Sequence, residues 1–198
     1  REIFMELQKL LSKARRAVED YKMIEDGDKI AVGLSGGKDS LTLLYILANM
    51  RRFYPAKFEV IAVSVDMGLG LDPDEVAAAQ KVCDELGVEY VVEKTQIGEI
   101  VFNVRKEKNP CSLCANMRRG ALNNTAKAHG CNKVALGHHA DDLVETLFLS
   151  LFYEGRLSTF SPVTALERAD VTVIRPMIYI REKEISGFAK DKLIIHNT

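Results

Sequence analysis

The chain has 198 residues, 47% of them hydrophobic and 28% charged, and its formal net charge at pH 7 is −1. These values fit a globular protein of one domain with at most a small appendage, and the near-zero charge excludes nucleic-acid binding driven by overall electrostatics. Four cysteines are too few for a disulfide framework, and no segment reads as a signal peptide or a membrane span, so we expect a cytoplasmic protein without a membrane partner.

Strands and helices alternate along the sequence. Residues 2–24 carry apolar side chains at helical spacing, which predicts an amphipathic helix. We assign residues 1–26 to this N-terminal helical extension and residues 27–198 to the main domain. Apolar runs predict strands at 29–34, 58–66, 88–92, 133–137 and 171–175. Helical spacing predicts further helices at 39–50, 72–86, about 110–128, 141–153 and 182–190, the second of them capped by Asp72 and Gly87.

Continuous apolar strands joined by helices indicate an α/β fold with an open, doubly wound parallel sheet of five strands, covered by helices on both faces. In such sheets a ligand binds outside the carboxyl ends of the strands, where the strand order reverses. We therefore sought functional residues in the loops that follow strands.

The loop after the first strand reads "GLSGGKDS" (33–40). Its glycines allow the backbone to approach a ligand, and its N–H groups form an anion site with the start of the next helix, so the expected ligand is a phosphate group. A Walker A loop is excluded because only three residues separate Gly33 from Gly37, and Asp39 follows Lys38. A glycine-rich turn without a ligand is the less favoured alternative. The candidate phosphate-binding residues are Leu34, Ser35, Gly36, Gly37, Lys38, Asp39 and Ser40.

The string "SGGKDS" resembles the pyrophosphate-loop (PP-loop) ATPases, which split ATP between the α- and β-phosphates and adenylate a substrate. Three later strings are more specific, because "CSLCANMRRG", "GHHADDLVET" and "RPMIYIREKEI" are similar to strings of the family that makes 2-thiocytidine in tRNA. The similarity runs from about residue 28 to residue 190, which is most of the chain.

The resemblance implies the strand order 3-2-1-4-5, with the reversal between the first and fourth strands. The strands followed by "SGGKDS" and "GHHADD" then lie side by side, and the segments after the other strands open at the same edge. We therefore expect ATP to contact Val65, Asp66, Gly137, Asp142 and Arg175 as well as the loop, with Mg²⁺ bound beside its phosphates.

Two cysteines, Cys111 and Cys114, begin the helix that opens at this edge, whereas Cys83 and Cys131 are placed at the opposite edge and interpreted as packing residues. From the residues alone, the pair fits redox chemistry, half of a zinc site or part of an iron–sulfur site. A thioredoxin-like pair would follow the first strand rather than the third, and no second half with zinc spacing appears.

The resemblance implies a [4Fe–4S] cluster held by three cysteines, with one iron left open to carry sulfur. The third family cysteine aligns with Ile180, or in some relatives follows an "HNxCP" segment, where this chain ends at "HNT". The chain also begins without Met, so we expect residues to be missing at one or both ends. A persulfide relay at the two cysteines stays an alternative to the cluster.

Carboxylates also follow the first and fourth strands. We expect catalytic roles for Asp39 and Asp141 together with the two cysteines, and Mg²⁺ binding by Asp142, with helix capping as the alternative. His138 and His139 are expected to be solvated loop residues and not metal ligands. Basic residues near the cysteines are the candidate tRNA contacts, with an ordinary charged surface as the alternative: Arg105, Lys106, Lys108, Arg118 and Arg119.

The activity that the resemblance implies is ATP-dependent sulfur transfer to tRNA. The C2 oxygen of a cytidine is adenylated, and sulfur carried at the cysteine pair then displaces AMP. The expected partners are tRNA and a sulfur donor, either a cysteine desulfurase or sulfide, and a homodimer is allowed for. The alternatives are thiolation of a uridine, amide or lysidine formation, and an ATP-binding iron–sulfur sensor without catalysis.

Overall fold

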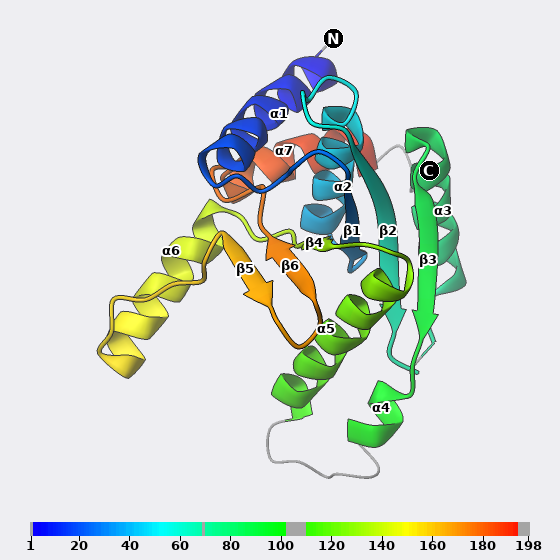
Figure 1. Ribbon diagram of the computed structural model, residues 1–198, viewed down its shortest axis with the longest axis vertical. Coiled ribbons are helices and arrows are strands. Elements are labelled where there is room, and N and C mark those ends of the chain that lie inside the picture. Colours follow the sequence, from blue (N-terminus) through cyan, green and yellow to red (C-terminus); the bar gives the residue numbers. More distant parts are fainter. Residues whose placement is uncertain (1, 69, 102–109, 194–198) are drawn as a thin grey trace.

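The computed structural model describes residues 2–68, 70–101 and 110–193, in which helices cover both faces of one sheet (Figure 1). The strands are β1 (Asp28–Leu34), β2 (Phe58–Asp66), β3 (Glu89–Lys94), β4 (Lys133–Ala135), β5 (Val163–Leu166) and β6 (Val171–Ile174). The helices are α1 (Glu2–Asp20), α2 (Lys38–Met50), α3 (Pro73–Leu86), α4 (Ile97–Glu99), α5 (Pro110–Ala128), α6 (Ala140–Leu149) and α7 (Glu182–Leu193). A π-helical turn (Ser150–Glu154) continues α6.

The strand order in the sheet is β3-β2-β1-β4-β6-β5. The pairs β1–β2, β1–β4, β2–β3 and β4–β6 are parallel. The strand predicted at 171–175 is β6, so the expected order of the parallel strands is confirmed. The order reverses between β1 and β4, and the loops after these two strands therefore open side by side at the carboxyl edge.

The prediction of five strands was wrong, because β5 forms a sixth strand at the edge of the sheet and pairs antiparallel with β6. β5 has four residues and none is fully buried, so it lacks the apolar run by which the other strands were recognised. The turn that joins β5 to β6 ends at Asp170, whose φ of 50° is in the left-handed region. The fold is therefore α/β with a mainly parallel sheet that carries one antiparallel edge strand.

Two hydrophobic cores form on the two faces of the sheet. Alternation along β1 directs Ile30 and Val32 to one face and Ala31 to the other. The first core receives buried residues from α1, α2, α3 and α7, and the second receives them from α5 and the region of α4. Helices therefore cover both faces, as expected. The N-terminal helix shares the first core, and the division of the chain at residue 26 stays a prediction.

Helix boundaries follow capping chemistry where the caps could be recognised. The Asp72 side chain accepts a hydrogen bond from the Asp74 N–H, and Gly87 ends α3 in the left-handed conformation, so both predicted caps are confirmed. The helix predicted at 141–153 leaves α-geometry after Leu149, and Figure 1 shows α6 running away from the sheet. Within the described ranges, no helix is long and apolar enough to cross a bilayer.

A buried ion pair joins β1 and β4 at the edge of the sheet opposite to the loops that follow these strands. Lys133 Nζ lies 2.6 Å from Asp28 Oδ2, and both side chains are buried. Burial alone would raise the pKa of Asp28, but hydrogen bonds from the Glu25 N–H, Lys133 and Asn132 outweigh it and hold this pKa below its ordinary value. Asp28 is therefore ionised in the folded protein and stabilises the start of β1 against β4.

Candidate active site

The loop between β1 and α2 is built around the hydroxyl of Ser40. This hydroxyl donates to the Gly37 carbonyl at 2.9 Å and accepts from the Ser35 N–H at 3.1 Å and the Ser35 hydroxyl at 3.2 Å. Gly36 has φ of +80°, which a residue with a side chain adopts only with strain. Gly37 is the N-cap of α2 and has no side chain to cap the first N–H groups, so these groups are available to an anion.

The loop after β4 approaches the β1–α2 loop closely at Gly137. A Cβ atom on Gly137 would lie 3.2 Å from the Asp39 carbonyl carbon and from the Ser40 nitrogen. This contact is with backbone atoms rather than with a flexible side chain. Glycine at this position therefore allows the two loops to meet.

His139 begins α6 and is buried, with 6% of its surface exposed. It is the N-cap of α6, and it forms a capping box with Asp142, whose carboxylate accepts the His139 N–H at 2.8 Å. The expectation that His139 is solvated was wrong, because its ring packs between the two loops. His139 and Asp142 have the spacing of a capping box but not its usual Ser/Thr and Glu/Gln residues, so the sequence carried only a weak signal for this arrangement.

Two cavities lie at the carboxyl edge and share the wall residues Leu34, Ser35, Val65 and Arg118. The larger cavity, about 720 Å³, extends over Gly36 to the start of α3 and has Ser64 and Tyr90 among its wall residues. The smaller cavity, about 340 Å³, has a more polar wall. Its polar and glycine residues are Gly33, Ser35, Asp39, Ser40, Arg118, Arg119, Gly137, His138 and Asp142.

The expected ATP-binding residues are distributed unevenly around these cavities. Val65 lines both cavities, whereas the Asp66 carboxylate accepts a hydrogen bond from the Gly68 N–H within the loop after β2. Asp66, Lys38, Gly37 and Arg175 are not among the wall residues in the part of the chain that the structure describes.

Arg175 contacts the same phenyl ring as His138, which is a wall residue of the smaller cavity. Its guanidinium stacks on Phe160 at 5.0 Å from the ring centroid and donates to the Ser161 carbonyl, and the His138 ring lies 5.0 Å from the same phenyl ring. His138, expected to be solvated, is partly buried. Burial, followed by the charge of Arg175, lowers the pKa of His138, so its ring faces the cavity as a neutral imidazole at pH 7.

Asp141, expected to be catalytic, connects α6 to α7. Its carboxylate accepts the Glu182 backbone N–H at 2.6 Å and lies 3.7 Å from the Arg181 guanidinium. The Glu182 hydrogen bond is the main cause of the lowered pKa of Asp141. Asp141 is not among the cavity wall residues of the described chain, whereas Asp142, one position later, is.

The cysteine pair lies on the first turns of α5. Cys111 is exposed and Cys114 is buried, with its sulfur 3.5 Å from the Met67 sulfur. Arg118, one helical turn after Cys114, lines both cavities, so the thiols lie on the helix that also forms the cavity wall. Among the described residues, no group of three or more His, Cys, Asp or Glu side chains has the geometry of a metal site.

The other two cysteines are inert packing residues, as predicted. Cys83 and Cys131 are buried, and burial raises the pKa of the Cys83 thiol to about 12 and that of Cys131 to about 11. The position aligned with the third family cysteine, Ile180, is also buried, in the core formed with α1, α2 and α7. Cys114 belongs to the core on the other face, so a side chain at Ile180 faces away from the cysteine pair.

The expected tRNA contacts are only partly described. Arg118 and Arg119 line the cavities, and Arg119 also donates to the Asn116 side chain. Arg105, Lys106 and Lys108 lie outside the described residues.

Comparisons with a protein-family model and with known enzymes indicate the same family for this chain. The PP-loop domain family matches residues 6–196. The chain is 44% identical to the tRNA-cytidine(32) 2-sulfurtransferase of Geobacter metallireducens over 93% of its own length and 71% of that protein. It is also 44% identical to the enzyme of that name from Marinobacter nauticus, of which it spans 62%.

Solved structures show the same fold. The U34-tRNA thiolase NcsA from Methanococcus maripaludis, solved with its [4Fe–4S] cluster, aligns with a TM-score of 0.76 and 29% identity over 94% of this chain and 64% of that one. An NH3-dependent NAD synthetase from Campylobacter jejuni aligns with a TM-score of 0.60 at 19% identity over 96% of this chain and 75% of that one, a likeness of fold alone. The chain therefore belongs to the PP-loop domain family, in the group of the tRNA-cytidine(32) 2-sulfurtransferases.

Proposed function

We propose that this chain is an ATP-dependent tRNA sulfurtransferase that adenylates the C2 oxygen of a cytidine and replaces that oxygen with sulfur. The observation that carries the proposal is the convergence of three segments at one sheet edge. The "SGGKDS" loop, the "GHHADD" loop and the helix that begins with "CSLC" all border the same pair of cavities or lie on the helix that does. The 44% identity to enzymes of this name supports the same reaction.

The nucleotide is held by the β1–α2 loop in this proposal. The Ser35 hydroxyl, on a residue that lines both cavities, and the uncapped N–H groups at the start of α2 bind the phosphates. The Ser40 hydroxyl holds the loop in this conformation through its hydrogen bonds to Ser35 and Gly37. The larger cavity, with its apolar wall at Leu34 and Val65, accepts the nucleoside.

The residues also fit a magnesium ion at the smaller cavity. Asp39 and Asp142 both line this cavity, and Asp39 Oδ1 is buried without a hydrogen bond in the described chain, its neighbour being the Lys38 ammonium at 3.2 Å. Carboxylate oxygens that share a cavity with phosphates are the usual protein ligands of Mg²⁺. A bound Mg²⁺ would neutralise charge on the phosphates. Asp39 and Asp142 would hold it, and Asp141 would act by fixing α7 to α6.

Sulfur is supplied at the cysteine pair. Cys111 is exposed at the start of α5, and Cys114 follows on the same face of the helix three residues later. Two thiols fit as two ligands of a [4Fe–4S] cluster, and the described residues offer no third. Such a cluster would carry a sulfur atom supplied by sulfide or by a cysteine desulfurase. A persulfide on one of the two cysteines would do the same if a cysteine desulfurase supplies its outer sulfur. The other cysteine then displaces the thiolated base, and an external thiol reduces the disulfide that is left.

The substrate is tRNA, bound at the basic surface next to the cavities. Arg118 and Arg119 line the cavities and are suited to phosphate contacts, and we assign the same role to Arg105, Lys106 and Lys108. The target base must leave its stack for its C2 edge to enter the site. We allow for a homodimer in this assembly.

The reaction has two bond exchanges. The C2 oxygen of the base attacks the α-phosphorus of ATP, and the bond to pyrophosphate breaks. Sulfur then attacks C2, and the C2–O bond breaks with AMP as the leaving group. The neutral His138 ring and Arg119 face the cavity in which this exchange takes place.

The test is pyrophosphate release measured with ATP in the presence and absence of tRNA. We expect release that depends on tRNA and is lost in Asp39→Ala and Ser35→Ala. Release of inorganic phosphate and ADP would contradict the assignment. A nucleoside digest of the product distinguishes 2-thiocytidine from 2-thiouridine, the product expected if the chain instead shares the U34 specificity named for the structural relative. A chain that binds ATP but never releases pyrophosphate would be a sensor.

A further inference from the structure

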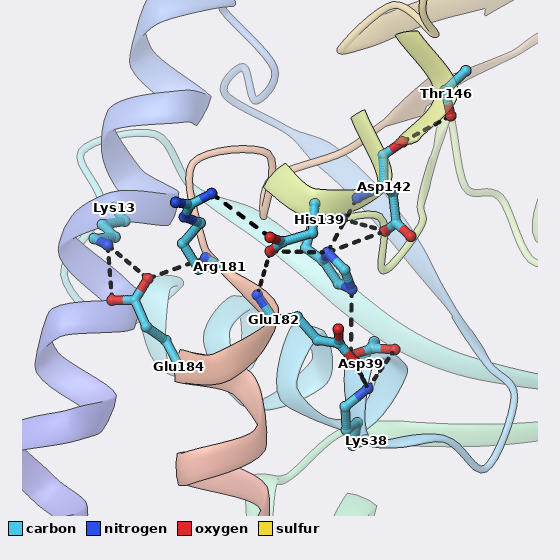
Figure 2. Close-up of polar contacts among 10 residues, drawn as sticks. Lys13, Lys38, Asp39, His139, Asp142, Thr146, Arg181, Glu182 and Glu184 are labelled. Atoms are coloured by element: carbon cyan, nitrogen blue, oxygen red, sulfur yellow. Dashed lines mark hydrogen bonds and ion pairs between the residues drawn. The ribbon is translucent and has the colours of Figure 1, made fainter. Parts of the chain in front are cut away.

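Lys38 stands in the phosphate-binding loop, yet its ammonium group points toward α7 (Figure 2). Its Nζ lies 3.0 Å from Glu182 Oε1 and 3.2 Å from Asp39 Oδ1. The residues that follow it, Asp39 and Ser40, line the smaller cavity, whereas Lys38 lines neither cavity in the described chain. In the nucleotide-free protein, the loop's own cation is thus paired with carboxylates of the protein.

Hydrogen bonds of the main chain hold the start of α7, and with it Glu182, next to α6. It is the first residue of α7, and its backbone N–H donates to Asp141 Oδ2 at 2.6 Å. The Ile180 carbonyl, just before α7, accepts the Ala140 N–H at 2.9 Å. These contacts join the start of α7 to the start of α6, so the main chain of Glu182 is fixed at a point from which its carboxylate reaches Lys38.

The ion pair between Lys38 and Glu182 is exposed enough for Lys38 to exchange Glu182 for another anion. The Lys38 and Glu182 side chains are 33% and 53% exposed, and pairs at such exposure are weakened by solvent. The pKa of Lys38 is raised, chiefly by its hydrogen bond to Glu182, so Lys38 carries a full charge. The phosphates of a nucleotide bring several negative charges into the same loop, and they compete for this ammonium against a single carboxylate of α7.

We propose that Glu182 is a positioning residue that holds the Lys38 ammonium away from the nucleotide cavities until the phosphates of ATP displace it. The inference rests on the proposed function, because it requires ATP in the β1–α2 loop. It adds that the affinity for ATP is set in part by a carboxylate on α7, a helix more than 140 positions from the loop in sequence.

Calorimetric titration of Mg·ATP into four proteins tests the proposal: wild type, Glu182→Gln, Lys38→Met and the double variant. Glu182→Gln removes one of the two carboxylates that hold Lys38, leaving Asp39, and should tighten ATP binding about two- to five-fold, the range that corresponds to a partly exposed ion pair. Lys38→Met should weaken binding, and in that background Glu182→Gln should have no further effect. Glu59→Gln is the matched control, because it removes the same charge from an exposed site at the opposite edge of the sheet and should change nothing.

The outcomes separate this inference from the proposed function. If wild type binds ATP but Glu182→Gln leaves the affinity unchanged or lowers it, the positioning role is wrong while the proposed function stands. If Lys38→Met binds ATP as tightly as wild type, Lys38 does not reach the phosphates and the inference is also wrong. If wild type does not bind ATP, the proposed function falls as well. Melting temperatures measured on each variant show that changes in affinity do not arise from unfolding.

Discussion

Gly137→Ala tests whether the site depends on close approach of its two main loops. The new Cβ atom would lie 3.2 Å from the backbone of Asp39 and Ser40, closer than an ordinary carbon contact, and neither backbone atom can rotate away. Overpacking of this kind costs about 1–3 kcal/mol of stability, which corresponds to a fall in melting temperature of roughly 2–12 °C for a chain of this size. If the loops separate to relieve the contact, the strain returns on binding, and the affinity for ATP should fall by roughly 5- to 150-fold.

The assay is thermal unfolding together with calorimetric ATP binding. Gly120→Ala is the control, because Gly120 lies inside α5 with nothing within 4 Å of the position of a Cβ atom and without a positive φ. An alanine there should leave the fold intact and raise stability by about 0.5–1 kcal/mol. A Gly137→Ala protein with wild-type stability and wild-type ATP affinity would refute the close contact between the loops.

Three further changes test other parts of the molecule. Asp28→Asn should lower the free energy of unfolding in urea by about 3–5 kcal/mol, because it leaves the buried Lys133 charge with only the exposed Glu25 carboxylate, at 3.8 Å, as a counter-charge. In the wild-type protein the folded pKa of Asp28 is depressed. The stability that Asp28 contributes is therefore complete above its unfolded pKa of about 4 and is lost as the pH falls below that value. A loss of stability that begins near neutral pH would contradict this role of Asp28. Replacing Cys111 or Cys114 with Ser should abolish sulfur transfer and any visible iron–sulfur absorption in an anaerobic preparation, while tRNA-dependent pyrophosphate release persists. Cys83→Ser should cost about 1–3 kcal/mol and leave thiolation unchanged, whereas a loss of sulfur transfer at wild-type stability would show that this thiol is not merely a packing residue.

The sequence was sufficient for the parallel part of the fold because its strands appear as continuous apolar runs, and β1, β2, β4 and β6 are largely buried on both faces. β2 and its neighbours lie within a few residues of their predicted positions, and the caps of α3 at Asp72 and Gly87 are present. β5 was missed because a four-residue edge strand, half exposed and joined by a tight turn, has no such run. The end of α6 at Leu149 was missed because a π-helical turn keeps the apolar spacing.

The sequence predicted which loops meet at the site, but it did not predict where the individual side chains of those loops point. Topology brought Ser35, Asp39 and Asp142 to one cavity, as the sequence indicated. The neighbouring Asp141 points to α7 instead, since adjacent residues on a helix face different ways. The position of Lys38 beside Glu182 could not be anticipated, because it depends on how the start of α7 packs against α6, a contact between segments distant in sequence.

The most direct test of the account is mass spectrometry of nucleosides from tRNA after anaerobic incubation with the protein, ATP, Mg²⁺ and a sulfur donor. We predict that 2-thiocytidine appears with equal amounts of AMP and pyrophosphate, and that it disappears when ATP is left out or Asp39 is replaced by Ala. Unmodified cytidine accompanied by ADP and inorganic phosphate would contradict it.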